Sequence, residues 1–489
     1  MTSRSSDIRD WDLVIYGATG DAGTAVAIYV ANNLYNNNND DDDDTNRRFR
    51  WAIAGRSERK LNQLRSRIIV GRLKSSATDE FGIITADSSS IDNMNNMAKS
   101  TRILVSAVGP YTTLGENIYS ACVKNGTHYT DITGEVDWVY LMREKYKKRA
   151  KETGSTLCSF AGYDCVPCNI TMHLARSVLL NDHINDTTAS ASTSTKKDDD
   201  NNTSTSYLTS AETVTRVNGG TFPRGTIRTM ISKLPEGAGF ARNLIRYSDG
   251  DNNNNERRKT IRSLLLWLLP RWSPEFGAFT LPHFMGWCNI PVVHNSLGSV
   301  IDCVYHDRIA VPYSRECLGT GYGLLQILCI YAILLMVIPW FLCFQIFVIS
   351  VPTSADFLLK LFDSLQYRGN SPQNQKKLED STVEVWTYVT SSLGSKAKVH
   401  MFVNGDPGIK CTSMLAAETA FSMLSLLDKN QLPKGIIGSP SMIVGDELVK
   451  RLQDEGMNDC TLSVTTEGKK TSTSTNAKVY NEKNMKKNS

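Results

Sequence analysis

The sequence predicts an α/β protein that begins with a doubly wound parallel sheet and continues into a second domain. A β-branched apolar run over 13–16 breaks at Gly17, where a glycine-rich turn leads into an Ala- and Val-rich helix. Strand-like and helix-like runs then alternate, with short connections, as far as Ser159. This is the pattern of a parallel sheet covered by helices. A later uncharged apolar run, within 318–355, interrupts the second domain.

The turn after the first strand has the composition of a dinucleotide-binding turn. Gly17, Gly20 and Gly23 follow one another at intervals of three residues, and Ala18 and Thr19 lie between the first two. One glycine makes the tight turn, one lets the backbone approach a pyrophosphate, and one lets helix and strand pack closely. The phosphates then lie at the helix N-terminus, on N–H groups and the positive end of the dipole. An ordinary strand-to-helix turn is the alternative.

The end of the second strand favours NADP over NAD. After an Asn- and Asp-rich insertion over 36–46, the strand 49–54 is followed by Gly55, Arg56 and Ser57. NAD enzymes usually carry Asp or Glu at this strand end to accept from the ribose 2′-OH, whereas an arginine accommodates a 2′-phosphate. Because no acid stands here, we expect NADP, with Arg56 at the 2′-phosphate. The alternative is a solvated arginine at the start of a helix.

The next strand ends supply further candidate contacts to the cofactor. Asp87 follows the third strand, 81–85, and the fourth strand leads into Ala107, Val108 and Gly109. Because ligands of open parallel sheets bind outside the carboxyl ends of the strands, we expect this last loop beside the nicotinamide ribose. The elements that complete a six-stranded Rossmann-type sheet are the helices 114–125 and 136–152 and the strands 127–130 and 155–159.

Five short motifs follow one another at compatible spacings: GATGDAG, AGR, VSAVGPYTTLGE, HYTDITGE and AGYDCVPCN. Together they resemble the saccharopine dehydrogenase-like oxidoreductases, which are related to the trans-acting enoyl reductases. The resemblance covers 12–177 strongly and 211–312 and 397–464 more weakly. It implies an NADP-binding Rossmann domain followed by an α/β substrate domain, with a substrate that is generally unassigned. Membrane-associated animal members are found on lipid droplets and other membranes.

Four polar side chains on loops after the predicted strands are candidates for the catalytic site: Tyr111, Asp131, Glu135 and Asp164. Hydride transfer leaves a developing negative charge that needs a proton donor or electrostatic stabilisation, and the cofactor carries the rest of the chemistry. Tyr111 is a candidate donor, and the carboxylates are candidates to orient a donor or hold an amine. The alternative, which we favour for Asp131 and Asp164, is that they cap helices and fix loops.

Composition argues against several other classes of protein. The eleven cysteines are scattered, odd in number and mostly inside apolar runs, as expected of reduced thiols. The single CxxC pair, Cys165 and Cys168, has no second pair and no His at ligand spacing, so we expect no metal site. A formal net charge of +4 over 489 residues gives no case for nucleic acid. Motifs of hydrolases, proteases and kinases are absent from the sequence.

The run from Leu318 to Ala355 contains no Asp, Glu, Lys or Arg, and a run of this length predicts a membrane segment. Because the resemblance continues on both sides of it, we expect a hairpin that turns at Pro339 and returns both ends to the same face. Its arms, 324–338 and 340–351, would each reach about 20 Å into a hydrocarbon core of about 30 Å. A single crossing is the alternative.

These observations divide the chain into six predicted parts: an NADP-binding Rossmann domain (1–177), a low-complexity insertion (178–210), the first part of the substrate domain (211–317), the hydrophobic membrane segment (318–355), the second part of the substrate domain (356–465) and a disordered tail (466–489). The chain ends in a weak dilysine signal, Lys486 and Lys487. We therefore expect a membrane-associated, cytosol-facing protein of the endoplasmic reticulum or lipid droplet.

The predicted function is that of a membrane- or lipid-droplet-associated NADP-dependent oxidoreductase in lipid or glycolipid metabolism. Its expected partners are a lipid-like small molecule and a membrane or droplet surface, with homo-oligomerisation left open and no nucleic acid. The alternative is a non-catalytic NADP-binding scaffold protein of lipid droplets. A true saccharopine dehydrogenase of lysine metabolism is less favoured, because the arginines of the second domain are scattered rather than clustered for a substrate with several carboxylates.

Overall fold

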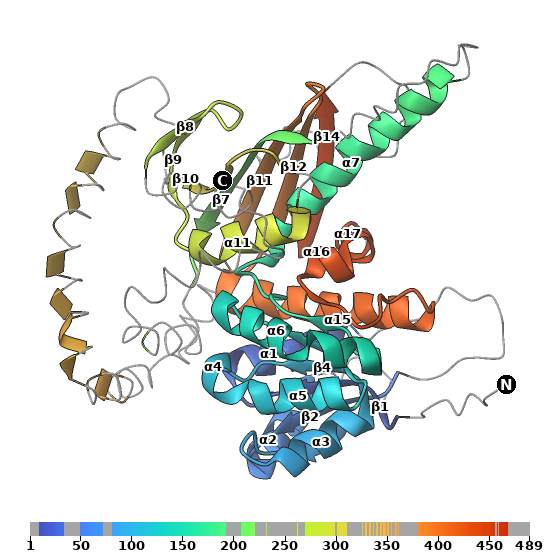
Figure 1. The fold of residues 1–489 in the computed structure, drawn as a ribbon. Coiled ribbons are helices and arrows are strands. Elements are labelled where there is room, and N and C mark those ends of the chain that lie inside the picture. Colours follow the sequence, from blue (N-terminus) through green and yellow to red (C-terminus); the bar gives the residue numbers. More distant parts are fainter. Residues whose placement is uncertain are drawn as a thin grey trace.

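The computed structural model describes residues 9–33, 49–71, 81–191, 207–220, 269–298, 301–310, 380–454 and 459–467, with single positions at 231, 262 and 457 and scattered positions between 325 and 360. Of residues 180–191 only the backbone is described. The predicted insertion at 36–46 and the predicted tail at 466–489 lie outside these ranges, apart from 466 and 467. Figure 1 shows two sheets, one above the other, with helices between and around them.

The first sheet is parallel throughout, and its strand order is β13-β6-β5-β4-β1-β2-β3. Its strands are β1 (Trp11–Tyr16), β2 (Trp51–Gly55), β3 (Gly82–Thr85), β4 (Thr101–Ser106), β5 (His128–Asp131), β6 (Leu157–Cys158) and β13 (Ile437–Gly438). Strands of such a sheet are apolar on both faces, which explains the continuous apolar run of β1. The predicted Rossmann-type sheet is confirmed.

Helices cover both faces of this sheet because alternate residues of each strand point to opposite sides. Leu13 and Ile15 pack into one core with α1, α2 and α15, whereas Val14 and Tyr16 pack into another with α3, α5 and α6. These helices are α1 (Asp21–Asn32), α2 (Glu58–Gly71), α3 (Ile91–Ser100), α5 (Glu116–Lys124), α6 (Val136–Thr153) and α15 (Thr412–Asp428). One short helix, α4 (Tyr111–Leu114), follows β4.

The second sheet is mixed and has the order β14-β12-β11-β7-β10-β9-β8. Its strands are β7 (Leu208–Asn218), β8 (Arg271–Ser273), β9 (Ala278–Pro282), β10 (Tyr305–Ala310), β11 (Thr382–Ser391), β12 (Lys396–Asn404) and β14 (Cys460–Glu467). Only β7 and β10 pair in parallel. The helix α7 (Val166–Ala191) packs on β11 and β12, and α11 (Gly286–Leu297) packs on β10.

The chain returns to the first sheet after β12. The elements of this return are η3 (Pro407–Cys411), α15, β13, α16 (Pro440–Ile443) and α17 (Gly445–Leu452). α15 packs against α1 and β4, and its side chains are buried from Thr412 to Ser425, so both sides of this helix are covered. These elements fall within the predicted second part of the substrate domain, and α7 runs to Ala191, inside the predicted insertion. The six-part division stays a prediction.

Most of the predicted membrane segment, 318–355, lies outside the described residues. Pro339 and Trp340 are helical, as are the described positions around them, and Figure 1 shows these ochre pieces following one another in a single arc. The predicted hairpin that turns at Pro339 rests on residues that are mostly outside the described ones, so it stays a prediction. Within the described part of the chain, no helix is long and apolar enough to cross a membrane.

Candidate functional site

The turn between β1 and α1 has a backbone that only glycines fit. Gly17 has a φ of +85°, and a Cβ at this position would lie 2.7 Å from Cγ2 of Val108. A Cβ at Gly23 would lie 2.2 Å from the carbonyl oxygen of Gly17. Side chains at either position would displace the neighbouring backbone or the loop after β4. The predicted roles of these glycines in a tight turn and in close packing of helix and strand fit this geometry.

Backbone hydrogen bonds fix the same turn, and no side chain caps the N-terminus of α1. The N–H groups of Gly17 and Ala18 donate to the carbonyl oxygen of Ala54, at 2.9 and 3.1 Å, and the Thr24 hydroxyl donates to the carbonyl oxygen of Ala18. Gly20 is the N-cap residue of α1, it is exposed, and no side chain caps the helix there. This combination fits a dinucleotide phosphate, because a helix N-terminus without a side-chain cap offers N–H groups to an anion.

Arg56 and Asp87 lie together at the neighbouring strand ends. The Arg56 side chain is exposed, and its positive charge contributes to a lowered pKa of Asp87. The larger cause of that lowered pKa is Ser89, whose N–H and hydroxyl both donate to Oδ1 of Asp87 at 2.9 Å. Arg56 is therefore exposed to solvent near the glycine turn between β1 and α1. A contact to a 2′-phosphate requires such a position. Its assignment to that phosphate stays a prediction.

The loop after β4 closes over the glycine turn. Ala107 donates its N–H to the carbonyl oxygen of Tyr16 at 2.9 Å, and Val108 lies against Gly17. A Cβ at Gly109 would lie 3.5 Å from the ring of Tyr111, and Gly109 precedes a cis peptide bond to Pro110. The structure thus brings the candidate cofactor residues of β1, β2, β3 and β4 to one edge of the sheet.

Tyr111 and Glu135 are held by the protein itself. The buried Tyr111 hydroxyl donates to the carbonyl oxygen of Ser106 at 2.8 Å. The Glu135 carboxylate accepts the N–H groups of Tyr111 and Thr112, at 2.8 and 3.0 Å, and the Thr112 hydroxyl as well. Glu135 therefore caps the first turn of α4, and burial raises the pKa of Tyr111 well above its ordinary value. The catalytic roles of both residues stay predictions, and these contacts favour the structural alternative.

Asp131 ties the end of β5 to the loop after β6. Its carboxylate accepts from the N–H groups of Thr133 and Phe160 and from the Ser159 hydroxyl, at 3.1, 3.2 and 3.0 Å. Phe160 has a φ of +70°, which residues other than glycine rarely adopt. Burial raises the pKa of Asp131 to about 7 in spite of these donors. The contacts match the loop-fixing role that we favoured for Asp131.

Asp164 differs from the other three candidates because it is partly exposed and lies beside the start of α11. A Cβ at Gly134 would lie 3.2 Å from Oδ2 of Asp164 and 3.9 Å from the side chains of Met285 and Trp287. The surrounding protein raises the pKa of Asp164 to about 6, and the charge on His283 acts in the opposite direction. Asp164 thus lies where the loop after β5 meets the start of α11.

Sequence reasoning missed three buried polar groups of the second domain: His283 after β9, Asn289 on α11 and Asp307 on β10. Nδ1 of His283 lies 3.0 Å from Oδ2 of Asp307, and Asn289 donates to the same oxygen at 2.9 Å. The pairing of β9 with β10 places His283 beside Asp307, although 24 residues separate them. No local motif spans such a distance, so no signal in a single sequence identifies the pair.

Cys165 and Cys168 are buried, and the Cys168 thiol donates to the carbonyl oxygen of Cys165. Within the described ranges, no cluster of three or more His, Cys, Asp or Glu side chains is arranged to hold a metal ion.

Comparisons with known proteins find a family model that matches the first six strands of the first sheet, β1 to β6. The family model of the saccharopine dehydrogenase NADP binding domain matches residues 13–158. A protein of Mycobacterium tuberculosis, whose name proposes a trans-acting enoyl reductase, is 26% identical over 92% of this chain and 97% of its own. The saccharopine dehydrogenase-like oxidoreductase of Mus musculus is 32% identical over 35% of this chain and 39% of its own. A lipid droplet localized protein of Caenorhabditis elegans is 34% identical over 34% of this chain and 36% of its own.

The matched region contains the glycine turn, Arg56 and the strand ends up to β6. Residues 13–158 therefore match the saccharopine dehydrogenase NADP binding domain family, and the chain shows distant homology to the trans-acting enoyl reductases and the saccharopine dehydrogenase-like oxidoreductases.

Proposed function

We propose that this protein is an NADP-dependent oxidoreductase that acts on a lipid-like substrate at a membrane or lipid-droplet surface. The observation that carries the proposal is the glycine turn, in which Gly17 and Gly23 leave no room for side chains beside the uncapped start of α1. Arg56 supports NADP rather than NAD, because β2 ends without an acid and with an exposed guanidinium.

The bound nicotinamide would supply a hydride, and the protein's own residues would hold the cofactor and provide a proton. Gly17, Gly20 and Gly23 would hold the pyrophosphate, and Arg56 would hold the 2′-phosphate. Among the predicted catalytic residues, Asp164 has the best position to meet a substrate, because it is partly exposed and lies beside the start of α11. Its raised pKa, about 6, keeps a fraction of the carboxyl protonated near neutral pH.

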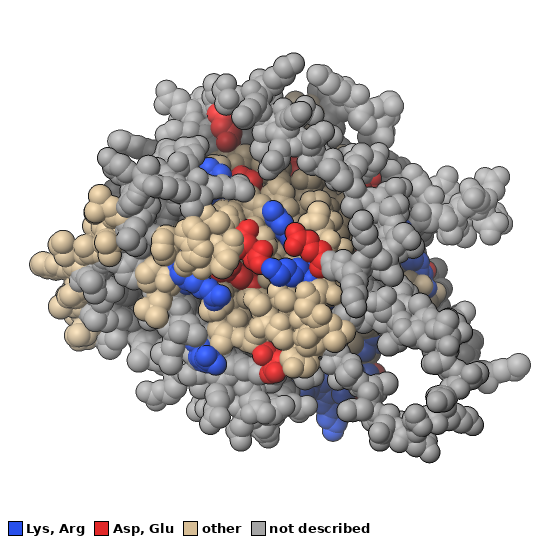
Figure 2. Space-filling model, turned by 90° about the horizontal axis from the view of Figure 1, so that it is seen from above, with Lys and Arg blue, Asp and Glu red and all other residues tan. Residues whose placement is uncertain are grey.

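Apolar side chains exposed between 325 and 360 support a lipid surface as partner. The large exposed ones include Leu325, Leu328, Ile333, Met336, Trp340, Phe344, Ile346 and Phe347. Figure 2 shows tan atoms, and no blue or red ones, among the coloured residues at the left edge of the molecule, on the side where these ochre pieces lie in Figure 1. Exposed apolar surface of this extent is typical of a site for a membrane or another protein. The name of the Caenorhabditis elegans relative agrees with a lipid surface.

The enzymatic part of the proposal is tested by NADPH oxidation with the full-length protein in detergent. A twelve-carbon α,β-unsaturated aldehyde is a suitable probe, because it offers both a carbonyl and an enoyl group for reduction. We expect oxidation that requires the aldehyde and is faster with NADPH than with NADH. Oxidation with NADH alone would contradict the assignment of NADP, and failure to bind either cofactor would contradict the function as a whole.

The lipid-surface part is tested by flotation with phosphatidylcholine vesicles. Replacing Ile333, Trp340 and Phe347 together by Ser should abolish flotation, because these side chains supply exposed apolar area. A matched control replaces Ile69 and Val70, which are exposed at the end of α2, by Ser. Equal flotation of both variants and the unchanged protein would contradict the assignment of the lipid contact to this segment.

A second candidate function is an NADP-binding scaffold without turnover. The hydrogen bonds of Tyr111 and Glu135 favour it, since both groups are already engaged by the fold. NADPH binding without oxidation in the presence of the aldehyde probe, together with vesicle flotation, is the result expected of a scaffold.

A further inference from the structure

The start of α11 brings apolar side chains to the loop after β5, at the carboxyl edge of the first sheet. A Cβ at Gly134, in that loop, would lie 3.9 Å from Cε of Met285 and 3.9 Å from Cη2 of Trp287. The same Cβ would lie 3.2 Å from Oδ2 of Asp164. One carboxyl group and two apolar side chains therefore meet over a residue that has no side chain of its own.

This meeting place is linked to the loops around the proposed cofactor. Gly134 precedes Glu135, whose carboxylate accepts the N–H group of Tyr111 at 2.8 Å. Tyr111 begins α4, and the loop before it contains Val108, which lies against Gly17. Ligands of open parallel sheets bind outside the carboxyl ends of the strands. The side chains over Gly134 are therefore beside the loops where we expect the nicotinamide end of the cofactor.

A buried set of hydrogen bonds holds the first turn of α11 on the second sheet. Nδ1 of His283 lies 3.0 Å from Oδ2 of Asp307 on β10, and the Asn289 amide donates to the same oxygen at 2.9 Å. His283 and Asn289 stand on either side of Met285 and Trp287 in the chain. Because the bonds are buried, they fix the backbone between them. Met285 and Trp287 therefore have a defined place beside the carboxyl edge.

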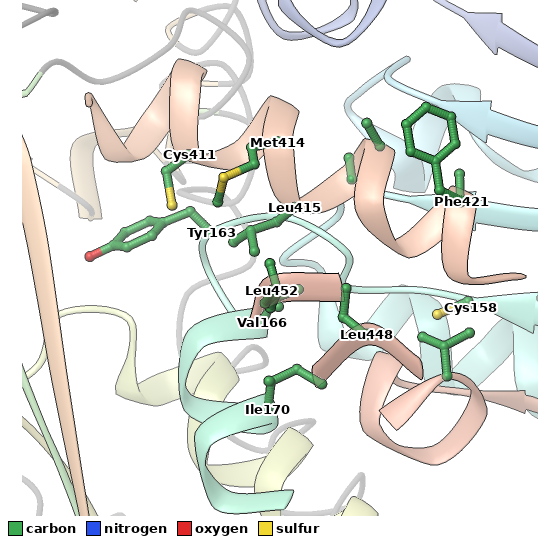
Figure 3. Close-up of a cluster of buried hydrophobic side chains, with 14 of the residues drawn as sticks. Cys158, Tyr163, Val166, Ile170, Cys411, Met414, Leu415, Phe421, Leu448 and Leu452 are labelled. Carbon is green, nitrogen blue, oxygen red and sulfur yellow. The ribbon is translucent and has the colours of Figure 1, made fainter. Parts of the chain in front are cut away.

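The loop that carries Asp164 is fixed by a different part of the chain. Figure 3 shows the ring of Tyr163 beside Cys411 and Met414, where η3 leads into α15, and all three side chains belong to one buried cluster. The N–H group of Tyr163 donates to Oγ1 of Thr412 at 3.3 Å. Asp164 follows Tyr163 directly, so these contacts also position Asp164. Both sides of the place over Gly134 are thus held before any ligand binds, which lowers the cost of binding one.

Solvent reaches this place. Gly134, Asp164 and Trp287 are each only partly buried, and Phe284 is 45% exposed. One part of the Trp287 indole packs against the buried cluster that includes side chains of α5 and α6. A partly exposed indole beside a carboxyl group offers an apolar surface next to a polar group. A molecule with an apolar chain and a polar end matches this arrangement.

We propose that Trp287 selects the substrate by its apolar chain, which lies against the indole while the carbonyl group at its end meets Asp164. This proposal rests on the proposed reductase function and names the part of the site that recognises a lipid-like substrate. Only substrates long enough to reach the indole bury apolar surface on it, so affinity rises with chain length. Trp287 is thus a specificity-determining residue, and it takes no part in the hydride transfer itself.

The first test compares two α,β-unsaturated aldehydes, of twelve and of four carbons, as substrates of the full-length protein. In Trp287→Ala we expect kcat/KM to fall by about tenfold for the twelve-carbon aldehyde and to stay within about twofold for the four-carbon one. The matched control is Trp272→Ala, because Trp272 is 43% exposed on β8. It should leave both values unchanged. Equal losses for the two aldehydes in Trp287→Ala, or no loss, would overturn the proposal.

Gly134→Ala probes the polar end of the same site. The added methyl would lie in ordinary contact with Trp287 but would crowd Oδ2 of Asp164, which both aldehydes would meet. We therefore expect kcat/KM to fall by similar factors for the two aldehydes. A loss confined to the twelve-carbon aldehyde would overturn the division of the site into an apolar side and a carboxyl side.

The second test reads binding without turnover. Full-length protein labelled with 5-fluorotryptophan is titrated with dodecanal and with butanal by ¹⁹F NMR, in the presence of NADP⁺, which has no hydride to give. The Trp287 signal is identified by its loss in Trp287→Phe, a variant that keeps an aromatic ring for packing. We expect dodecanal, but not butanal, to shift the Trp287 signal and to leave the Trp272 signal in place. An unshifted Trp287 signal, or an equal shift of both signals, would overturn the proposal.

The two tests separate this proposal from the reductase function. If dodecanal shifts the Trp287 signal and neither unsaturated aldehyde supports NADPH oxidation, the reductase fails and the recognition of the chain at Trp287 stands. If both aldehydes are reduced and Trp287→Ala reduces them as the unchanged protein does, the reductase stands and the selection by Trp287 fails.

Discussion

Two halves of the carboxyl edge of the first sheet differ in whether their polar groups are exposed or are bound by the protein itself. At β1 and β2, Gly17, Gly23 and the exposed Arg56 leave an open surface with backbone N–H groups. At β4 and β5, the carboxylates of Glu135 and Asp131 are buried and each accepts three hydrogen bonds from the protein. We call the first half the open half, because it leaves room and N–H donors for the proposed cofactor, and the second half the closed half, because its carboxylates hold the protein's own loops.

This difference shows that a polar residue after a strand can either hold the protein's own loops or face a ligand. The sequence alone does not distinguish these two roles. Glu135 and Asp164 both belong to the predicted catalytic group, yet one caps α4 and the other is partly exposed beside the start of α11. The hydrogen-bond partners of each side chain in the folded protein distinguish the two roles. The variants below break the open half or the closed half separately, so that loss of stability and loss of binding can be told apart.

The largest effect is expected for Gly23→Ala in the open half. The added Cβ would lie 2.2 Å from the carbonyl oxygen of Gly17, which belongs to the backbone and cannot move alone. We expect the free energy of unfolding to fall by more than about 4 kcal/mol and NADPH binding to disappear, as measured by urea unfolding and fluorescence titration. Gly71→Ala is the control, because nothing lies within 4 Å of a Cβ there. Equal behaviour of both variants would contradict the close packing of the turn.

The next effect concerns the pH dependence of stability in the closed half. Burial raises the pKa of Asp131 to about 7, so the folded state binds a proton that the unfolded chain has released above about pH 4. Stability from this group is therefore lost as the pH rises from about 4 to 7, by on the order of 3 kcal/mol. Asp131→Asn should remove this part of the slope in urea unfolding between pH 5 and 8. An identical slope in the variant would show that Asp131 is not the titrating group.

A smaller effect is expected for the cap of α4. In Glu135→Gln an amide NH₂ would face N–H donors of Tyr111 and Thr112, so we expect a loss of about 1–3 kcal/mol. Tyr111→Phe removes only the bond to the Ser106 carbonyl oxygen and should cost about 1 kcal/mol. Thermal unfolding checks both variants. If either abolishes turnover while stability stays unchanged, the residue acts in catalysis and not in capping.

The sequence contained enough information for the first sheet and the turn, since their residues are contiguous and their glycines obey local geometry. It contained too little for β13, because Ile437 and Gly438 join β6 only after α15 has brought the chain back to the first sheet. The same holds for His283 and Asp307, which meet through the pairing of β9 and β10. Local patterns predict backbone geometry, whereas contacts between distant segments depend on the completed fold.

The central claim is that the open half of the edge binds NADP. It is tested most directly by measuring NADPH and NADH affinity of the full-length protein beside Arg56→Ala. Arg56 is exposed, so the variant should keep its stability. We predict that NADPH binds more tightly than NADH and that the variant weakens NADPH binding by about tenfold, equivalent to about 1.4 kcal/mol, while NADH binding stays unchanged. Equal affinity for both cofactors, or equal weakening of both, would contradict the claim.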